Sequence, residues 1–137
     1  MSANMTSKRV IVTGGTRGLG RAIALRLAKA GARVAITYSK NEDDAEETRE
    51  LLRSAHPGSA PLVFKGSVVD SAHVKETVAS VVKEWGGVDV LVNNAGITQV
   101  LPVALVEEHD WDLVMDVNAK GAFLFSRGVL RHMIKAK

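Results

Sequence analysis

The chain has no cysteine, so it can form neither a disulfide nor a thiolate nucleophile or metal ligand. Its four histidines are scattered, without acidic partners at metal-ligand spacing, so we predict no metal site. Aromatic residues make up 4% and are not interleaved with basic clusters, which gives nucleic-acid binding no support. No apolar run approaches the ~20 residues of a membrane span, and segment 1–8 lacks the apolar core of a signal peptide. We therefore expect a cytoplasmic protein that binds neither nucleic acid nor membrane.

The residues that are present fit one globular domain over 1–137, with 46% apolar and 24% charged residues. The net charge of +3 either favours phosphate-bearing or acidic partners or reflects an ordinary solvated surface. Short β-branched runs alternate with helical patterns, which predicts an α/β fold of Rossmann type with a doubly wound parallel sheet. The expected strands are 10–12, 33–37, 61–65 and 88–92, and the expected helices are 19–30, 42–54, 71–85 and 110–137.

A glycine-rich loop joins the first expected strand to the first helix. A tight turn that brings backbone N–H groups close to a phosphate leaves no room for side chains, and the following helix start adds its positive dipole end. Alone, such a glycine triplet is equally typical of an ordinary turn. The residues that we expect to hold a pyrophosphate here are Gly14, Gly15, Thr16, Arg17, Gly18, Leu19 and Gly20, preceded by Thr13.

A second motif, Asn93-Asn94-Ala95-Gly96, directly follows the fourth expected strand. Carboxyl ends of parallel strands meet at one sheet edge, so both motifs should lie together. T-G-x-x-x-G-x-G combined with N-N-A-G resembles the short-chain dehydrogenase/reductase family, over Lys8 to Lys137 and only that family's N-terminal half. The resemblance implies strand order 3-2-1-4, and it implies that Asn93, Ala95 and Gly96 line the nicotinamide riboside site.

A third segment, 117–121, is similar to the family's helix segment whose asparagine, here Asn118, helps to organise the catalytic lysine through water. From the residues alone, an amide on an apolar helix face needs a fixed hydrogen-bond partner. A purely structural role at a helix irregularity stays open.

The cofactor expectation depends on the position about 20 residues beyond the glycines, where a carboxylate would bind the ribose of NAD. Tyr38 stands there instead, and Arg17, Ser39 and Lys40 are available for a 2′-phosphate, so NADP(H) is favoured. The alternative is that Arg17 and Lys40 are solvated surface charges. The resemblance further implies an adenine contact at Ser67-Val68, where the family usually has Asp or Asn followed by Val.

The last expected helix is apolar on two faces, one through Trp111 and Phe125 and the other through Leu113, Val117 and Leu124. We therefore predict a homo-oligomer through 110–137. Ordinary exposed apolar residues are the alternative.

The family's active-site serine and Tyr-x-x-x-Lys motif are missing, since the only tyrosine is Tyr38. The chain stops within a helical pattern, which suggests a cut and leaves the fourth strand as an open edge. The resemblance implies an NADP-dependent oxidoreductase that reduces a carbonyl by hydride transfer, most similar to reductases of 3-oxoacyl groups on acyl carrier protein in fatty acid biosynthesis. This chain would supply the cofactor-binding half. The alternatives are a non-catalytic NADP-binding module that needs a partner chain and a remnant that binds nothing.

Overall fold

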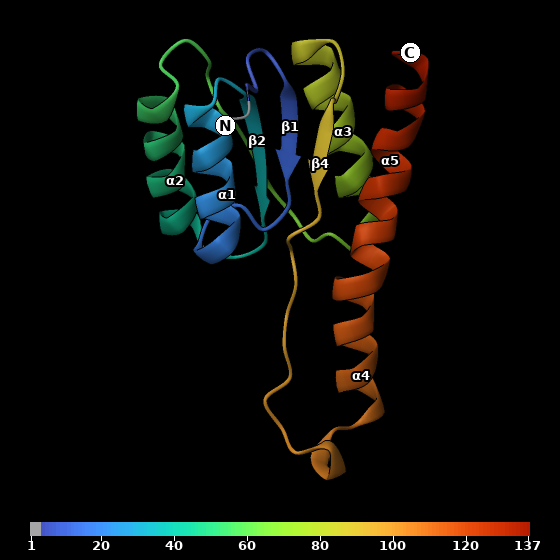
Figure 1. Ribbon diagram of the computed structural model, residues 1–137. Helices are drawn as coiled ribbons and strands as arrows, with labels where there is room; N and C mark the ends of the chain where they lie inside the picture. Colours follow the sequence, from blue (N-terminus) through green and yellow to red (C-terminus); the bar gives the residue numbers. More distant parts are fainter. Residues whose placement is uncertain (1–3) are drawn as a thin grey trace.

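The computed structural model describes residues 4–137 and contains one parallel sheet with helices on both faces (Figure 1). The strand order β3-β2-β1-β4 is the predicted one, and Val10 of the central strand pairs with Val34 on one side and Val90 on the other. The Rossmann-like α/β class is therefore confirmed. The strands are β1 (Arg9–Val12), β2 (Arg33–Tyr38), β3 (Leu62–Lys65) and β4 (Val90–Val92).

Helices cover both faces of the sheet (Figure 1). α1 (Gly18–Lys29) and α2 (Glu42–Ala55) pack on the face to which Val10 and Val12 point. α3 (Ser71–Trp85) and α5 (Gly121–Lys135) pack on the face of Ile11. Alternate residues of a strand point to opposite faces, so an almost wholly apolar β1 supplies both halves of the core.

The predicted helix boundaries are confirmed where a single residue sets them. Gly31 (φ +94°) and Gly86 (φ +81°) adopt the left-handed conformation just after α1 and α3. The side chain of Asn41 accepts a hydrogen bond from the backbone N–H of Asp44 at the start of α2, and Asp70 accepts from those of Ala72 and His73 at the start of α3.

The fourth strand is shorter than the predicted 88–92, and one of its edges is open, as expected. β4 pairs with β1 alone, and its three residues are half-buried because its other edge has no neighbouring strand in residues 4–137. Beside its amino end, the carboxylate of Asp89 accepts from the backbone N–H and Nε of Arg9 (both 2.8 Å) and from Nη2 (2.9 Å). This ion pair lowers the pKa of Asp89 to about 2.

The predicted helix 110–137 is interrupted. α4 (Glu108–Met115) runs into a π-helical turn at Asp116–Lys120 before α5 begins. One extra residue in a turn rotates the following side chains by about 100°, so one stripe cannot continue across the turn. Trp111 is 63% exposed, whereas Leu124, which we expected on a second, outer face, is 6% exposed and belongs to the core beside α3. The prediction for Leu124 was wrong.

Residues 97–115 extend beyond the carboxyl ends of the strands as an arm (Figure 1). The arm contains a short 3₁₀ turn, Val103–Leu105, and α4. Its large apolar side chains are solvent-exposed, Val100 by 87% and Val103 by 91%. Within residues 4–137, no helix is both long and apolar enough to cross a bilayer.

Candidate functional site

The loops after β1, β2 and β4 meet at the carboxyl edge of the sheet (Figure 1). The backbone N–H of Thr13 donates to the carbonyl of Val92 at the end of β4, and that of Gly15 donates to the carbonyl of Thr37 in β2, each at 3.0 Å. The glycine loop therefore lies between the segments 38–40 and 93–96, as the two sequence motifs predicted.

Thr13 and Asn94 connect the two motifs directly. The buried hydroxyl of Thr13 accepts hydrogen bonds from the backbone N–H groups of Asn94 (3.1 Å) and Ala95 (3.0 Å). In return, the side-chain amide of Asn94 donates to the carbonyls of Thr13 (3.1 Å) and Gly14 (3.0 Å). Four hydrogen bonds thus fix the conformation of the glycine loop, and they involve a threonine and an asparagine that the sequence analysis did not select as site residues.

Two glycines of the loop show different steric requirements. A Cβ atom on Gly20 would lie 2.1 Å from the carbonyl oxygen of Gly14 and 2.4 Å from Nδ2 of Asn94, so only glycine fits. Gly18 has φ +53°, and a Cβ there would meet no atom within 4 Å. The space above Gly18, at the first residue of α1, is therefore open to a ligand.

The start of α1 has no side-chain cap. Arg17 occupies the N-cap position without capping, and the first turn contains no acidic residue. The loop before it is nevertheless fixed, because the carbonyl of Thr16 accepts from Nε of Arg21 (2.8 Å) and from the hydroxyl of Thr48 (2.7 Å). A rigid loop beside an uncapped helix start is the arrangement that binds an anion.

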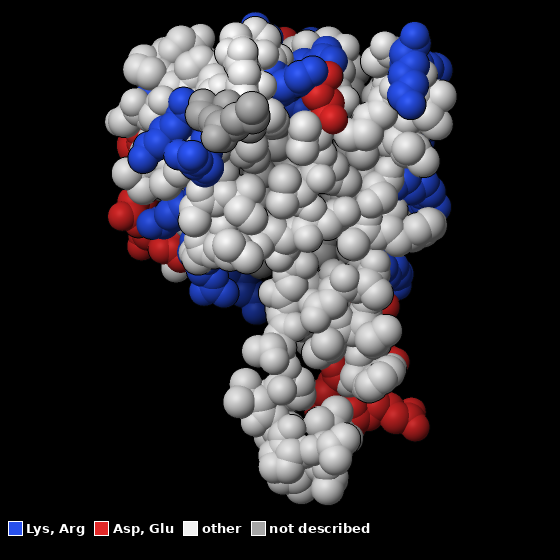
Figure 2. Space-filling model, viewed as in Figure 1, with Lys and Arg blue, Asp and Glu red and all other residues white. Residues whose placement is uncertain are grey.

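Tyr38 ends β2 half-buried, and Ser39 and Lys40 follow it on the surface. One nearby carboxylate already has a partner: Glu42 pairs with Lys65, which lowers the pKa of Glu42 and raises that of Lys65 through the mutual hydrogen bond. Within the described chain, neither Arg17 nor Lys40 forms an ion pair. Figure 2 shows basic side chains at the lower edge of the body, beneath α1.

The two residues expected to contact adenine, Ser67 and Val68, follow β3 directly after Gly66. Val68 is buried (7% exposed) and faces the core, where a Cβ on Gly121 would lie 2.4 Å from its Cγ2. Ser67 is exposed, and its hydroxyl accepts from the backbone N–H of Val69 at 3.4 Å. Only the side chain of Ser67 and the backbone of Val68 are thus available to a ligand.

His73 lies beneath the same segment. A Cβ on Gly66 would lie 2.2 Å from its Nδ1, so the imidazole packs directly on that glycine, and its ring meets Phe125 edge to face at 6.4 Å. Burial lowers the pKa of His73, against the opposing effect of Asp70 and Glu76. Sequence reasoning missed this residue, because a histidine in the first turn of a helix gives no signal of burial.

Asn118 lies in the π-helical turn and makes two hydrogen bonds with one residue. Its Oδ1 accepts from the backbone N–H of Ile97 and its Nδ2 donates to the carbonyl of Ile97, each at 2.8 Å. The expectation that this amide has a fixed partner is confirmed. Asn93 points elsewhere, since its Nδ2 donates to the hydroxyl of Ser126 in α5 at 3.0 Å.

A parallel sheet of order β3-β2-β1-β4 with a glycine loop after its central strand defines the Rossmann-like α/β class. The chain belongs to the short-chain dehydrogenase family, whose model matches residues 8–137. It is 39% identical over 131 residues to the 3-oxoacyl-acyl-carrier-protein reductase FabG of Staphylococcus epidermidis, covering 96% of this chain and 53% of that protein.

Solved structures agree with this membership. A short-chain dehydrogenase/reductase variant from Serratia marcescens aligns with a TM-score of 0.88 at 35% identity, covering 96% of this chain and 53% of that one. An NADH-dependent reductase in complex with NAD aligns with a TM-score of 0.87 at 27% identity, covering 99% of this chain and 56% of that one. The chain thus spans about half the length of the relatives that it matches.

Proposed function

We propose that this chain is the cofactor-binding half of a short-chain oxidoreductase and that it holds the pyrophosphate of a nicotinamide dinucleotide on the 13–20 loop. The observation that carries the proposal is the open space above Gly18 at the uncapped start of α1. The first backbone N–H groups of α1 have no partner within the helix, and Asn94 keeps the geometry of the preceding loop fixed before a ligand arrives.

The two ends of the dinucleotide would lie on either side of this loop. Ala95 and Gly96 present backbone beside the glycine loop and form the nicotinamide side with Asn93, whose side chain is engaged by Ser126 and which contributes through its backbone. Ser67 and the backbone of Val68 form the adenine side.

We propose NADP(H) as the cofactor, because Arg17 and Lys40 have no acidic partner among residues 4–137 and Tyr38 and Ser39 present no carboxylate to a 2′-phosphate. Calorimetric titration with NADP and NAD tests this choice. Arg17→Ala and Lys40→Ala should each weaken NADP binding ~10-fold and leave NAD binding nearly unchanged, since one phosphate contact is lost. Lys29→Ala, at the far end of α1, is the control. Equal affinity of the unmodified chain for NAD and NADP would exclude the assignment.

For the chemistry, we propose reduction of the carbonyl of a 3-oxoacyl thioester on acyl carrier protein, on the basis of the similarity to the Staphylococcus reductase. Bound cofactor would supply the hydride. Asn118, in the π-helical turn, would fix Ile97 and the segment after Gly96, and it would position a catalytic lysine through water. The cytoplasmic location of the protein and its place in fatty acid biosynthesis stay predictions.

A non-catalytic NADP-binding subunit is the second candidate, favoured by the observation that the only tyrosine, Tyr38, lies on the cofactor side. Titration with NADP, followed by NADPH oxidation with an acetoacetyl thioester, distinguishes the two. Binding without turnover, even when a polypeptide that supplies the family's missing half is added, favours the subunit. Turnover when that polypeptide is added favours the reductase.

We also propose that the chain self-associates through 110–137. The support is the set of exposed apolar side chains that the helix keeps on its solvent side, namely Trp111, Leu113, Phe123, Leu130 and Ile134. Leu130→Glu, rather than a change at the buried Leu124, is the correct test. An unchanged native mass on sedimentation would contradict the proposal.

A further inference from the structure

The carbonyl of Thr16, one residue before the N-cap of α1, is held from two sides. The hydroxyl of Thr48 in α2 donates to it at 2.7 Å, and Nε of Arg21 in α1 donates to it at 2.8 Å. Thr48 is 0% exposed and Thr16 only 5%, so water hardly competes for this carbonyl. The carbonyl therefore keeps one direction, toward α2.

Arg21 is itself held by α2. Its Nη2 donates to the carboxylate of Glu47 at 2.9 Å and to the backbone carbonyl of Asp44 at 3.3 Å. The guanidinium thus bridges the glycine loop and α2, and it cannot turn away without losing these bonds. The direction of the Thr16 carbonyl depends on α2, a helix that contributes none of the residues proposed to touch the cofactor.

The backbone changes direction just after this carbonyl. Arg17 is extended (φ −152°, ψ 170°), and its own carbonyl accepts the first bond of the helix, from the N–H of Arg21 at 3.1 Å. In a helix longer by one residue, the N–H of Gly20 would donate to the carbonyl of Thr16. Because that carbonyl is held elsewhere, the N–H of Gly20 has no acceptor among residues 4–137.

α2 shows how the equivalent N–H group is satisfied when no ligand is needed. Asp44 is the third residue of α2, as Gly20 is the third residue of α1, and its N–H donates to the side chain of Asn41 at 2.9 Å. α1 has no such acceptor, because Arg17 stands at its N-cap position. A longer helix would therefore compete with a ligand for the N–H of Gly20.

We propose that Thr48 and Arg21 are positioning residues that keep the N–H of Gly20 free for the pyrophosphate of the cofactor. They do so by holding the carbonyl of Thr16 out of its reach. The inference rests on the proposed function, since it concerns the donors that the glycine loop offers to a dinucleotide. Without the two bonds, Arg17 would be free to join the helix, and the carbonyl of Thr16 would accept from Gly20. The chain would stay folded but lose one donor to the ligand.

Hydrogen exchange between water and the amide of Gly20, measured by NMR on the ligand-free 137-residue chain, tests this step directly. Thr48→Val removes the hydroxyl and keeps the shape of the side chain. Exchange at Gly20 should slow ~5-fold or more, because the amide gains a backbone acceptor. A role in packing alone would instead leave the exchange unchanged or make it faster. Thr48→Ser keeps the hydroxyl and should restore the exchange of the unmodified chain.

Calorimetric titration supplies the second measurement. Thr48→Val should weaken the binding of both NADP and NAD ~10-fold, because both carry the pyrophosphate and one charge-assisted hydrogen bond is lost. This pattern differs from that expected of Arg17→Ala, which should affect NADP alone. Urea denaturation should show nearly unchanged stability, so a loss of affinity would not reflect unfolding.

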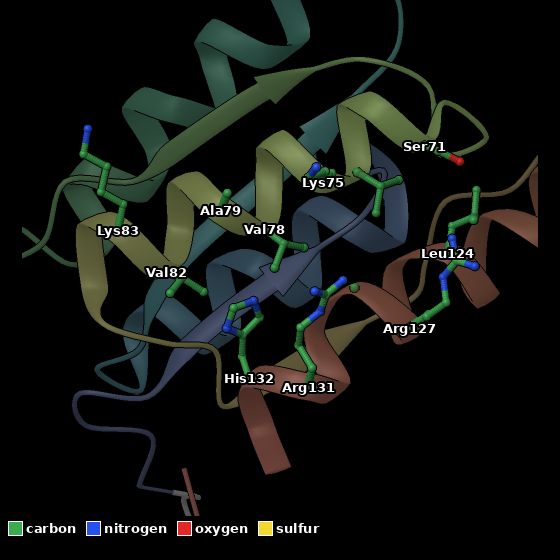
Figure 3. Close-up of a pocket in the computed structure, with 12 residues that line it drawn as sticks. Ser71, Lys75, Val78, Ala79, Val82, Lys83, Leu124, Arg127, Arg131 and His132 are labelled. Atoms are coloured by element: carbon green, nitrogen blue, oxygen red, sulfur yellow. The ribbon is translucent and has the colours of Figure 1, made fainter. Parts of the chain in front are cut away.

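Two variants on the opposite face of the sheet are the matched controls. Thr77→Val makes the same change at a buried threonine of α3 whose hydroxyl has no hydrogen-bond partner in the described part of the chain. Arg131→Met is the control for Arg21→Met, because Arg131 lines a groove between α3 and α5, away from the glycine loop (Figure 3). Arg21→Met should repeat both effects of Thr48→Val, and the controls should show neither. If Thr48→Val does not fold, Arg21→Met decides.

Three results would overturn the proposal. The first is unchanged or faster exchange at Gly20 in folded Thr48→Val, and the second is a Thr48→Ser variant that behaves like Thr48→Val. The third is an equal loss of dinucleotide affinity in Thr77→Val. Failure of the proposed function is recognised separately, because the unmodified chain would then bind neither NADP nor NAD. The exchange at Gly20 would still decide whether Thr48 sets the start of α1.

Discussion

α1 and α2 lie side by side on one face of the sheet and begin in opposite ways (Figure 1). α2 starts with a capping Asn41 and three acidic residues in its first turn, which satisfy its N–H groups and complement its dipole. α1 starts at Gly18 with neither. A helix start that lacks both is less stable by about 1 kcal/mol or more. α2 is completed by its own sequence, whereas α1 would be completed by the proposed ligand.

The largest effect is expected from adding one methyl group to the loop before α1. Gly20→Ala would place a Cβ 2.1 Å from the carbonyl oxygen of Gly14, and the loop would have to move. We expect a loss of about 2–3 kcal/mol of unfolding free energy and no measurable dinucleotide binding. Urea denaturation and calorimetric titration measure the two quantities.

Gly58→Ala is the matched control, because a Cβ there would approach no atom closer than 3.7 Å and its φ lies outside the left-handed region. It should change stability by less than about 0.5 kcal/mol. If Gly20→Ala behaved like Gly58→Ala, the close packing of the loop on Asn94 would be disproved.

Asn94 holds the glycine loop in place through two hydrogen bonds from its side-chain amide. Asn94→Ala removes both donors to the carbonyls of Thr13 and Gly14, and we expect a loss of about 1–2 kcal/mol in stability and ~10-fold in NADP affinity. Asn93→Ala, one residue away, removes only a bond to Ser126 and should leave both quantities nearly unchanged. Equal effects of the two variants would mean that the loop does not depend on Asn94.

An acidic residue in the first turn of α1, as α2 has, tests whether the start of α1 binds a phosphate. Leu19 is 70% exposed, so Leu19→Asp loses little packing and should stabilise the ligand-free chain by about 0.3–1 kcal/mol through the helix dipole. The same carboxylate would repel a pyrophosphate, and NADP affinity should fall ~10-fold or more. Stability and affinity thus move in opposite directions.

Asp43→Asn in the first turn of α2 is the counterpart of this change. It should lower stability by a few tenths of a kcal/mol and leave NADP affinity unchanged, because α2 has no proposed ligand. If Leu19→Asp left NADP affinity intact, the start of α1 would not be the phosphate site.

These two helix starts also show which features the sequence could predict. Asn41, Gly31 and Gly86 act through their own backbone or nearest neighbours, so local patterns were enough to predict the helix ends that they set. The strand order likewise followed from the family resemblance. The position predicted for Leu124 was wrong because the π-helical turn at Asp116–Lys120 rotates the residues that follow it about the helix axis, whereas periodicity assumes an unbroken helix.

The site was predicted less completely than the fold, since side-chain direction depends on tertiary packing. Asn93 and Asn94 are adjacent and chemically identical, yet only Asn94 faces the glycine loop. Val68 stands in a motif that suggests ligand contact, and its side chain is part of the core because Gly121 admits it. Neither outcome has a signal in composition or spacing.

The smallest expected effect is on the stability of the adenine-side segment as pH changes. Burial against Gly66 and Phe125 lowers the pKa of His73 below its ordinary 6.5, so the unfolded chain binds this proton more readily than the folded chain. Stability should therefore be undiminished above pH 6.5 and should decline as pH falls below it, until the folded histidine is also protonated. Asp89 does not contribute in this range, because its pKa of about 2 keeps it ionised in the folded state and the unfolded carboxylate protonates only near pH 4.

His73→Gln should flatten the decline between about pH 6.5 and 5, as measured by urea denaturation. His56→Gln is the control at a second histidine, one that contacts the carbonyl of Ala32 away from this segment. A decline that survived in His73→Gln would assign the acid sensitivity to another group and leave the imidazole beneath Gly66 with a packing role alone.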